Sequence, residues 1–473
     1  MIKEFAKKAR AGSIDLVEHT RKAIESAQKI NEEYKYITEL GDAISRAQEL
    51  QKSAKEGKAK GKLFGVLITA KDAICVQNLE STASSAILKG YKPLYNATVI
   101  ERCLEEGAII LGKTVQDEFG FGGFCTNVGK GYSKPKNPND KKRVCGGSSG
   151  GAAGITKKAD FAHIALAEST GGSIANPASF CGVVGLTPTY GRVSRHGLIS
   201  YANSLDKIGA MAKTVEDAAL LLEIISGADP KDSTSASTPV PEYSEIPGTV
   251  QGIKIGVLES AVDERCDNSV RKAVLCAISK LEELGARRIN IELPLNSKYA
   301  LAAYYILALS EASTNLAKFC GIRYGAYDTL NGTYNDYFSR VRSDNFGDEA
   351  KRRILLGTFA RMAGFRDAFY TQAAKIRTQL IKEYKEAFKK VDVIITPSMP
   401  TIAPTFEHVK KLTPLQSYLM DELTCPPNLA GLPHISIPCA EHEGLPIGLQ
   451  IIGDHFCENK IIQVAKTWSQ ISK

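Results

Sequence analysis

Apolar strand-like segments alternate with helical segments from residue 63 onward, and this alternation constrains the fold more than any other feature. Residues 63–72 (LFGVLITAKD) read as an apolar strand that ends in two charges, and residues 97–108 predict a helix that leads directly into a strand at 109–114. Buried strands that alternate with helices are typical of α/β proteins with a parallel or mixed sheet. The same pattern predicts further strands at 161–168, 253–260, 391–397, 434–440 and 448–453, and helices at 214–227, 269–285 and 350–389.

We therefore predict an α/β fold with one large domain, in which a mixed sheet of roughly ten strands is covered by helices. Residues 1–60 are predicted to form a helical N-terminal segment, with apolar residues at helical spacing behind a Ser13 N-cap, and residues 61–473 the main domain. Residues 227–252, rich in Pro, Ser and Thr, are interpreted as a long surface linker within that domain, because the strands on both sides look fully buried. A boundary between two domains is the alternative.

The composition is that of an ordinary globular protein. The 473 residues carry a net charge of +8 and 11 cysteines, none of them in a CxxC or Cys/His metal pattern. Free buried thiols in a reducing compartment are the simplest interpretation, so we expect a cytoplasmic protein. The N-terminus has acidic residues and no apolar core, unlike a signal peptide, and no run approaches the about 18 apolar residues of a membrane span. The densest basic run, residues 52–62, is interpreted as a solvated helix end, with an RNA or membrane contact as the alternative.

Two glycine-rich stretches that contain serine are the main candidates for chemistry: CGGSSGGAAG at 145–154 and GGSIANPASF at 171–180. The GGSSG string fits the G-x-S-x-G nucleophile elbow of α/β-hydrolases, which needs a core strand before it and a later histidine. The preceding residues form a polar loop, and nothing in the sequence marks either His434 or His455 as that histidine. Glycine turns with serine caps are the structural alternative.

Three strings taken together resemble the amidase signature family: GVLITAKD at 65–72, GGSSGG at 146–151 and TGGSIANPASFCGVVGLTPTYGRVS at 170–194. Within that family, the strings at 190–209, 311–325, 350–370 and 420–453 are similar to the A subunits of glutamyl-tRNA(Gln)/aspartyl-tRNA(Asn) amidotransferases. The resemblance covers residues 60–455 approximately and implies the amidase signature fold.

The resemblance implies an amide hydrolase with a Ser-Ser-Lys triad. Ser173 would be the nucleophile, Lys71 the base, and Ser148 the bridge between them, held by a cis peptide. A lysine can act as a base only where burial favours its neutral form, and the apolar residues before Lys71 could supply that burial. Hydrolysis of a carboxamide also needs donors for the oxyanion. The resemblance assigns these to the main-chain N–H groups of Thr170, Gly171 and Gly172.

The resemblance also implies glutamine as the substrate. Arg353 would bind its carboxylate, Asp421 its α-amino group, and Tyr304 would complete the pocket; opposed charges suit a desolvated zwitterion. By spacing alone, Arg353 could be a solvated helix residue and Asp421 an ordinary helix cap.

The implied assembly is a glutaminase subunit with B-type and C-type partner subunits. Ammonia would pass to the B-type subunit, which makes most of the contact with misacylated tRNA and uses ATP and magnesium. Neither a metal nor a cofactor is expected in this chain, nor a membrane partner. The acceptor, Glu-tRNA(Gln), Asp-tRNA(Asn) or both, would be chosen by the partner.

The chain departs from the family strings at three positions. Ser169 stands where aspartate is usual, Ala175 where arginine is usual and Thr187 where lysine is common; the interval from Ser148 to Ser173 is also one residue longer. We expect the first two changes to compensate, because an Asp–Arg pair lost as a whole leaves no unpaired charge. The alternatives are a stand-alone amidase for a non-amino-acid amide and a catalytically impaired structural subunit.

Overall fold

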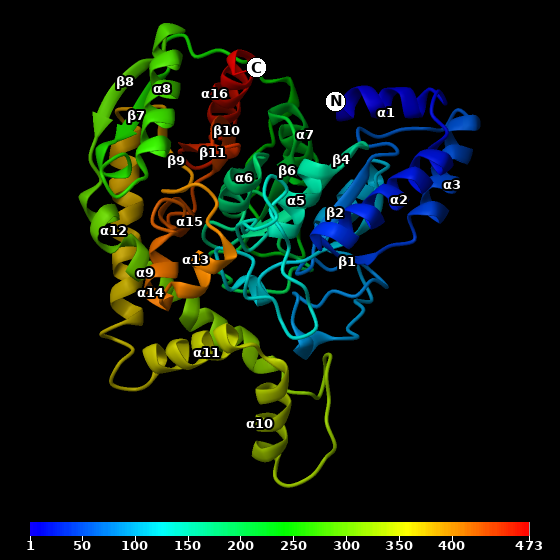
Figure 1. The fold of residues 1–473 in the computed structure, drawn as a ribbon, viewed down its shortest axis with the longest axis vertical. Coiled ribbons are helices and arrows are strands. Elements are labelled where there is room, and N and C mark those ends of the chain that lie inside the picture. Colours follow the sequence, from blue (N-terminus) through cyan, green and yellow to red (C-terminus); the bar gives the residue numbers. More distant parts are fainter. Residues whose placement is uncertain (473) are drawn as a thin grey trace.

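One mixed sheet extends through nearly the whole length of the chain (Figure 1). The structure is a computed structural model that describes residues 1–472, and within them the sheet has 11 strands in the order β1-β3-β2-β4-β6-β5-β10-β11-β9-β7-β8. β2 is parallel to β3 and β4, β7 is parallel to β8 and β9, and the other neighbours are antiparallel. The strands are β1 (Ile37–Leu40), β2 (Leu67–Lys71), β3 (Ile109–Thr114), β4 (His163–Ser169), β5 (Val184–Thr187), β6 (Lys207–Ala212), β7 (Lys254–Leu258), β8 (Arg287–Ile291), β9 (Val393–Pro397), β10 (His434–His442) and β11 (Leu445–Gly453).

Helices cover both faces of this sheet, and a further group extends away from it at the bottom of Figure 1. They are α1 (Ile2–Arg10), α2 (Leu16–Tyr34), α3 (Ala43–Lys55), α4 (Thr98–Glu105), α5 (Gly150–Lys158), α6 (Ala175–Cys181), α7 (Val215–Ile225), α8 (Asn268–Glu283), α9 (Pro294–Asn315), α10 (Tyr334–Asn345), α11 (Asp348–Arg361), α12 (Tyr370–Phe388), α13 (Phe406–Lys411), α14 (Pro414–Leu419), α15 (Cys425–Leu429) and α16 (Glu458–Ile471). α4, α7, α8 and α16 share one apolar cluster with the sheet, while α2, α3, α5 and α6 share another.

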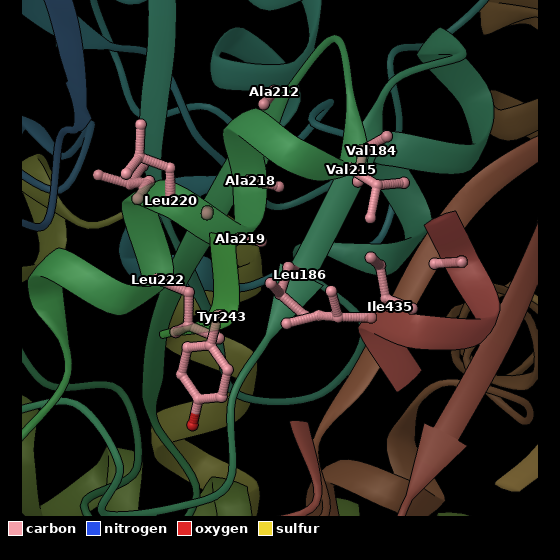
Figure 2. Packing of buried hydrophobic residues seen from close by; sticks show 14 of the residues in the cluster. Val184, Leu186, Ala212, Val215, Ala218, Ala219, Leu220, Leu222, Tyr243 and Ile435 are labelled. Carbon is pink, nitrogen blue, oxygen red and sulfur yellow. The ribbon is translucent and has the colours of Figure 1, made fainter. Parts of the chain in front are cut away.

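The central strands are buried on both faces. In β4, Ile164 and Leu166 belong to the first cluster and Ala165 and Ala167 to the second, so the strand reads as a continuous apolar run. Figure 2 shows part of the first cluster, where residues of α7 pack beside Leu186 of β5 and residue 435 of β10. This double coverage is the physical basis of the alternation seen in the sequence.

The predicted fold class is confirmed: an α/β domain with a large mixed sheet covered by helices. Strands β1, β5, β6 and β8 were not predicted. β1 and β8 are the two edges of the sheet, and β8 (RRINI) exposes both of its arginines, so neither edge strand has an apolar run. β5 has only 4 residues, too few to show a pattern.

Three local predictions need correction. Asp15 rather than Ser13 caps α2, accepting a hydrogen bond from the Glu18 N–H at 3.0 Å. The predicted helical stretch 350–389 is interrupted at 362–369, where Gly364 adopts a left-handed φ of +88°, so α11 and α12 are separate helices. The N-terminal segment 1–60 includes strand β1, and its helices share the second apolar cluster with β2, β3 and β4.

Residues 227–252 form an ordered surface crossing. The Tyr243 side chain is fully buried, and its hydroxyl donates to the Glu458 carboxylate at 3.2 Å. The first apolar cluster includes residues from both sides of this crossing. All 11 cysteines are free thiols, and in residues 1–472 no helix is both long and apolar enough to cross a membrane.

Candidate active site

Lys71 is the last residue of β2 and has no exposed surface. Its Nζ donates to the Ser148 hydroxyl at 2.6 Å, to the main-chain oxygen of Glu168 at 2.9 Å and to the Glu168 carboxylate at 2.7 Å. An ammonium group has three N–H donors, and these contacts use all of them. Lys71 and Ser148, which the family resemblance assigned to one triad, are therefore directly hydrogen-bonded.

The two glycine-rich serine stretches also meet in space. The Gly147–Ser148 peptide is cis, as the resemblance implied. The Ser149 N–H donates to the main-chain oxygen of Ser173 at 3.3 Å, which joins the loop before α5 to the loop before α6. Ser173 itself is buried, with 6% of its surface exposed. The main chain of Ser173 thus lies next to the residue that follows Ser148, whose hydroxyl binds Lys71 at the end of β2.

The loop between β4 and α6 presents main-chain donors next to Ser173. Within residues 1–472, the N–H groups of Thr170, Gly171 and Gly172 donate to no other group. Neither glycine can be replaced easily: a Cβ at Gly171 would lie 2.6 Å from the Tyr304 hydroxyl, and one at Gly172 would overlap Thr424. Amides that are free and held at a tight turn are suited to stabilise an oxyanion.

An acidic cluster next to Lys71 was missed by sequence reasoning. The Thr170 hydroxyl lies 2.7 Å from the Glu168 carboxylate and 2.8 Å from that of Asp206, and all three residues are buried. Burial, together with the charge of Glu168, raises the pKa of Asp206. The available signal was Glu168 itself, an acidic residue at the end of the otherwise apolar strand HIALAES.

A cavity of about 330 Å³ is lined by the loop 122–127 and by residues of α11, α13 and α14. Arg353 and Asp421 both line it, whereas Tyr304 does not; its neighbour Tyr305 does. The structure thus brings together the two opposed charges that the family resemblance assigned to the substrate. Tyr304 instead contacts the nucleophile loop at Gly171.

Arg353 is a buried cation with one part of its guanidinium unused. Nε donates to the Glu349 carboxylate at 2.8 Å and Nη1 to the Tyr201 hydroxyl at 2.6 Å, while Nη2 donates to no group in residues 1–472. Four aromatic rings surround the guanidinium at 5.1–5.7 Å: those of Phe121, Tyr201, Tyr305 and Tyr418. Nη2 is therefore available to a carboxylate that enters the cavity.

Asp421 is held by Tyr305, whose hydroxyl donates to Oδ2 at 2.7 Å. Burial raises the pKa of Asp421 to about 6, partly offset by the Tyr305 hydrogen bond and by Arg353. Oδ1 lies 3.2 Å from the position that a Cβ on Gly123 would take. The Gly123 carbonyl accepts hydrogen bonds from Gly147 N–H at 2.8 Å and from the Asn176 side chain at 2.7 Å. Gly123 therefore connects the charged cavity with the serine loops.

The other interpretations of the serine motifs find no support in the geometry. The ring of His434 lies near Asn428 and that of His455 near Asp454 and Ala430, so neither serves Ser148. No group of three or more His, Cys, Asp or Glu residues within 1–472 could hold a metal ion.

Comparison with known proteins agrees with this arrangement. A family model described as Amidase matches residues 18–462. The chain belongs to the amidase family. This confirms the resemblance seen in the sequence strings.

Individual relatives of the amidase family are similar over nearly the full length. The A subunit of the glutamyl-tRNA(Gln) amidotransferase of Geobacillus sp. (strain WCH70) is 48% identical, with 96% of this chain and 93% of that protein covered. The A subunit of the Persephonella marina enzyme is 44% identical, with 92% and 89% covered. The crystal structure of the A subunit from Thermotoga maritima has a TM-score of 0.80 at 34% identity, with 96% and 92% covered. The peptide amidase of Stenotrophomonas maltophilia has a TM-score of 0.84 at 27% identity, with 100% and 96% covered.

The three departures from the family strings have different surroundings. The Ser169 hydroxyl donates to the Gly171 carbonyl at 3.2 Å, and Ala175 is fully buried. Thr187 is buried without a partner for its hydroxyl and pairs across the sheet with His434. A buried lysine lies near this residue pair: Lys207 of β6 donates to the Leu432 carbonyl at 2.9 Å. Burial lowers the pKa of His434, and the charge of Lys207 lowers it further.

Proposed function

We propose that this chain is the glutaminase subunit of a tRNA-dependent amidotransferase. The observation that carries the proposal is the pair of opposed charges in one cavity, the Nη2 of Arg353 and the carboxylate of Asp421. Gly123, which lines this cavity, accepts a hydrogen bond from the Gly147 N–H in the loop that carries Ser148. A substrate with one carboxylate and one ammonium group satisfies both charges, and glutamine adds a carboxamide for the serine. The two relatives compared above are named as A subunits of glutamyl-tRNA(Gln) amidotransferases, which supports the assignment to an amidotransferase.

In the proposed reaction, Ser173 Oγ forms a bond to the carboxamide carbon of glutamine. Its proton passes to Ser148 as Ser148 gives its own proton to neutral Lys71. The free N–H groups of Thr170, Gly171 and Gly172 stabilise the oxyanion. The protons return along the same path to the leaving nitrogen, ammonia departs, and water releases glutamate from Ser173.

The ammonia is then transferred to a B-type subunit, which uses ATP and magnesium to amidate misacylated Glu-tRNA(Gln); Asp-tRNA(Asn), amidated by the same chemistry, is the second candidate acceptor. A C-type subunit completes a cytoplasmic heterotrimer. This chain needs no metal or cofactor for its own half of the reaction.

The test is to purify the protein from its native cell, identify the subunits that accompany it, and assay the complex. Glutamine-dependent amidation of Glu-tRNA(Gln) that is lost in Ser173→Ala but restored by free ammonia supports the proposal. A wild-type complex that accepts ammonia and never glutamine indicates the catalytically impaired subunit. Turnover of a simple amide by the isolated chain, with no partner subunit, indicates the stand-alone amidase.

A further inference from the structure

The contacts of the Thr170 hydroxyl indicate how many protons the acidic cluster holds. Its oxygen lies within hydrogen-bond distance of two carboxylates, 2.7 Å from Glu168 and 2.8 Å from Asp206. A hydroxyl has one proton to donate, so the second contact requires a carboxyl that donates to it. The Glu168–Asp206 pair therefore holds one proton, in agreement with the raised pKa of Asp206, whose causes are burial and then the charge of Glu168.

The other oxygen of Glu168 faces the base. Lys71 Nζ lies 2.7 Å from Glu168 Oε2 and donates at the same time to Ser148. With all three N–H groups donating, Nζ has no lone pair for the Ser148 proton. Lys71 must lose a proton before it can act, and Glu168 Oε2 is the carboxylate oxygen in contact with it.

We propose that Glu168 is a positioning residue that takes this proton from Lys71 inside the site. The inference rests on the proposed function and adds one residue to its relay. A proton moves from Nζ to Oε2, which converts the ammonium and carboxylate into an amine and a carboxylic acid. The amine then accepts the Ser148 proton, Ser148 accepts that of Ser173, and Ser173 Oγ bonds to the carboxamide carbon. No net charge enters or leaves the buried pair, which a desolvated environment favours.

The other titratable groups around the Lys71–Glu168 pair interact with other partners. Asp117 accepts the N–H groups of Cys125 at 2.9 Å and Asn127 at 2.8 Å, and burial raises its pKa while Lys71 and Arg353 lower it. Burial raises the pKa of the Cys125 thiol. Burial raises the pKa of Asp206, and the charge of Arg195 partly offsets this. Gly120 also lies next to the pair: a Cβ there would lie 3.6 Å from Ser148 Oγ and 3.7 Å from Glu168 Oε2.

The proposal predicts the sign of a pH shift. If Glu168 accepts the lysine proton, Glu168→Gln forces Lys71 to lose it to water, and the acid limb of kcat moves to higher pH; kcat is the quantity to follow because protonation of Asp421 acts on KM. If Glu168 were only a counter-ion, it would stabilise the ammonium, and its removal would move the acid limb to lower pH. The two roles thus give opposite results.

The experiment measures glutamate release by the assembled complex with B- and C-type subunits, from about pH 5 to about pH 10, which brackets carboxyl and lysine titration. We expect Glu168→Gln to move the acid limb of kcat, measured at saturating glutamine, upward by about one pH unit or more, so that kcat below neutrality falls at least about tenfold and recovers at high pH. Glu223→Gln is the matched control. Glu223, like Glu168, forms an ion pair with a lysine, but its partner is Lys62 and not Lys71. We expect it to leave the profile unchanged.

An acid limb that stays in place or moves to lower pH in Glu168→Gln overturns the inference. Ammonia-supported amidation checks that the variant complex is assembled. If it is not, Glu168→Asp replaces it: this variant keeps a carboxyl, so we expect a lower rate with the acid limb in its wild-type place, and an upward shift would contradict the proposal. A wild-type complex without Ser173-dependent glutaminase activity would instead contradict the proposed function.

Discussion

Replacement of Arg353 by lysine tests the cavity most directly, because it keeps the charge and removes the geometry. The guanidinium binds Glu349 through Nε and Tyr201 through Nη1, which leaves Nη2 for a substrate carboxylate. An ammonium group on a flexible stem cannot hold these three positions at once. We therefore expect Arg353→Lys to bind glutamine weakly while the nucleophile remains intact.

The expected loss follows from the one hydrogen bond that Nη2 supplies. A hydrogen bond to a charged group contributes about 1.5–3 kcal/mol, which corresponds to a decrease of about 10- to 150-fold in kcat/KM for glutamine, mainly through KM. An aliphatic amide without a carboxylate does not use this bond, so its kcat/KM should be unchanged. Both substrates are assayed by ammonia release from the assembled complex.

Arg361→Lys is the control on the same helix. Arg361 Nε donates to the Ser313 hydroxyl at 3.1 Å, and its side chain does not line the cavity with Arg353. We expect this variant to turn over glutamine like the wild type. The reasoning is refuted if Arg353→Lys keeps normal kcat/KM for glutamine, or if it loses the same factor for the uncharged amide.

Three further predictions concern single residues. Lys71→Ala should lose several orders of magnitude in glutamine hydrolysis but retain ammonia-supported amidation. Lys71→Arg should be nearly as inactive, because a guanidinium keeps its proton. Normal glutaminase activity in Lys71→Arg would exclude Lys71 as the base. Because the pKa of Asp421 is about 6, protonation below that pH should raise KM for glutamine by about tenfold per pH unit without a matching fall in kcat, as initial rates at several pH values would show. Burial raises the pKa of Glu118 from 4.5 to about 7, so the folded state binds this proton more tightly. The free energy of unfolding should then decline by up to about 3 kcal/mol as the pH rises from 4.5 to about 7. Urea unfolding at these two pH values should show this decline in the wild type and not in Glu118→Gln.

The sequence by itself determined the features that depend on local pattern. Strands such as β3 and β4 are buried on both faces, so their continuous apolar runs were visible without a structure. The serine stretches were visible because their glycines, which allow tight turns with exposed amides, lie within a few residues of each serine. Family strings then indicated Arg353 and Asp421, which their own spacing would not have marked.

Only the tertiary structure decided which of these residues meet. β2 and β4 are parallel neighbours with Ala70 opposite Leu166, and this register places Lys71 of one strand against Glu168 of the other. No local period records a contact between residues 97 positions apart. Tyr305 and Glu168 stayed hidden because each lies in an element that reads as buried structure, and their roles arise from side chains that arrive from other elements. The sequence shows which site residues can carry a charge. Packing decides which group each of them contacts, and this contact sets its protonation.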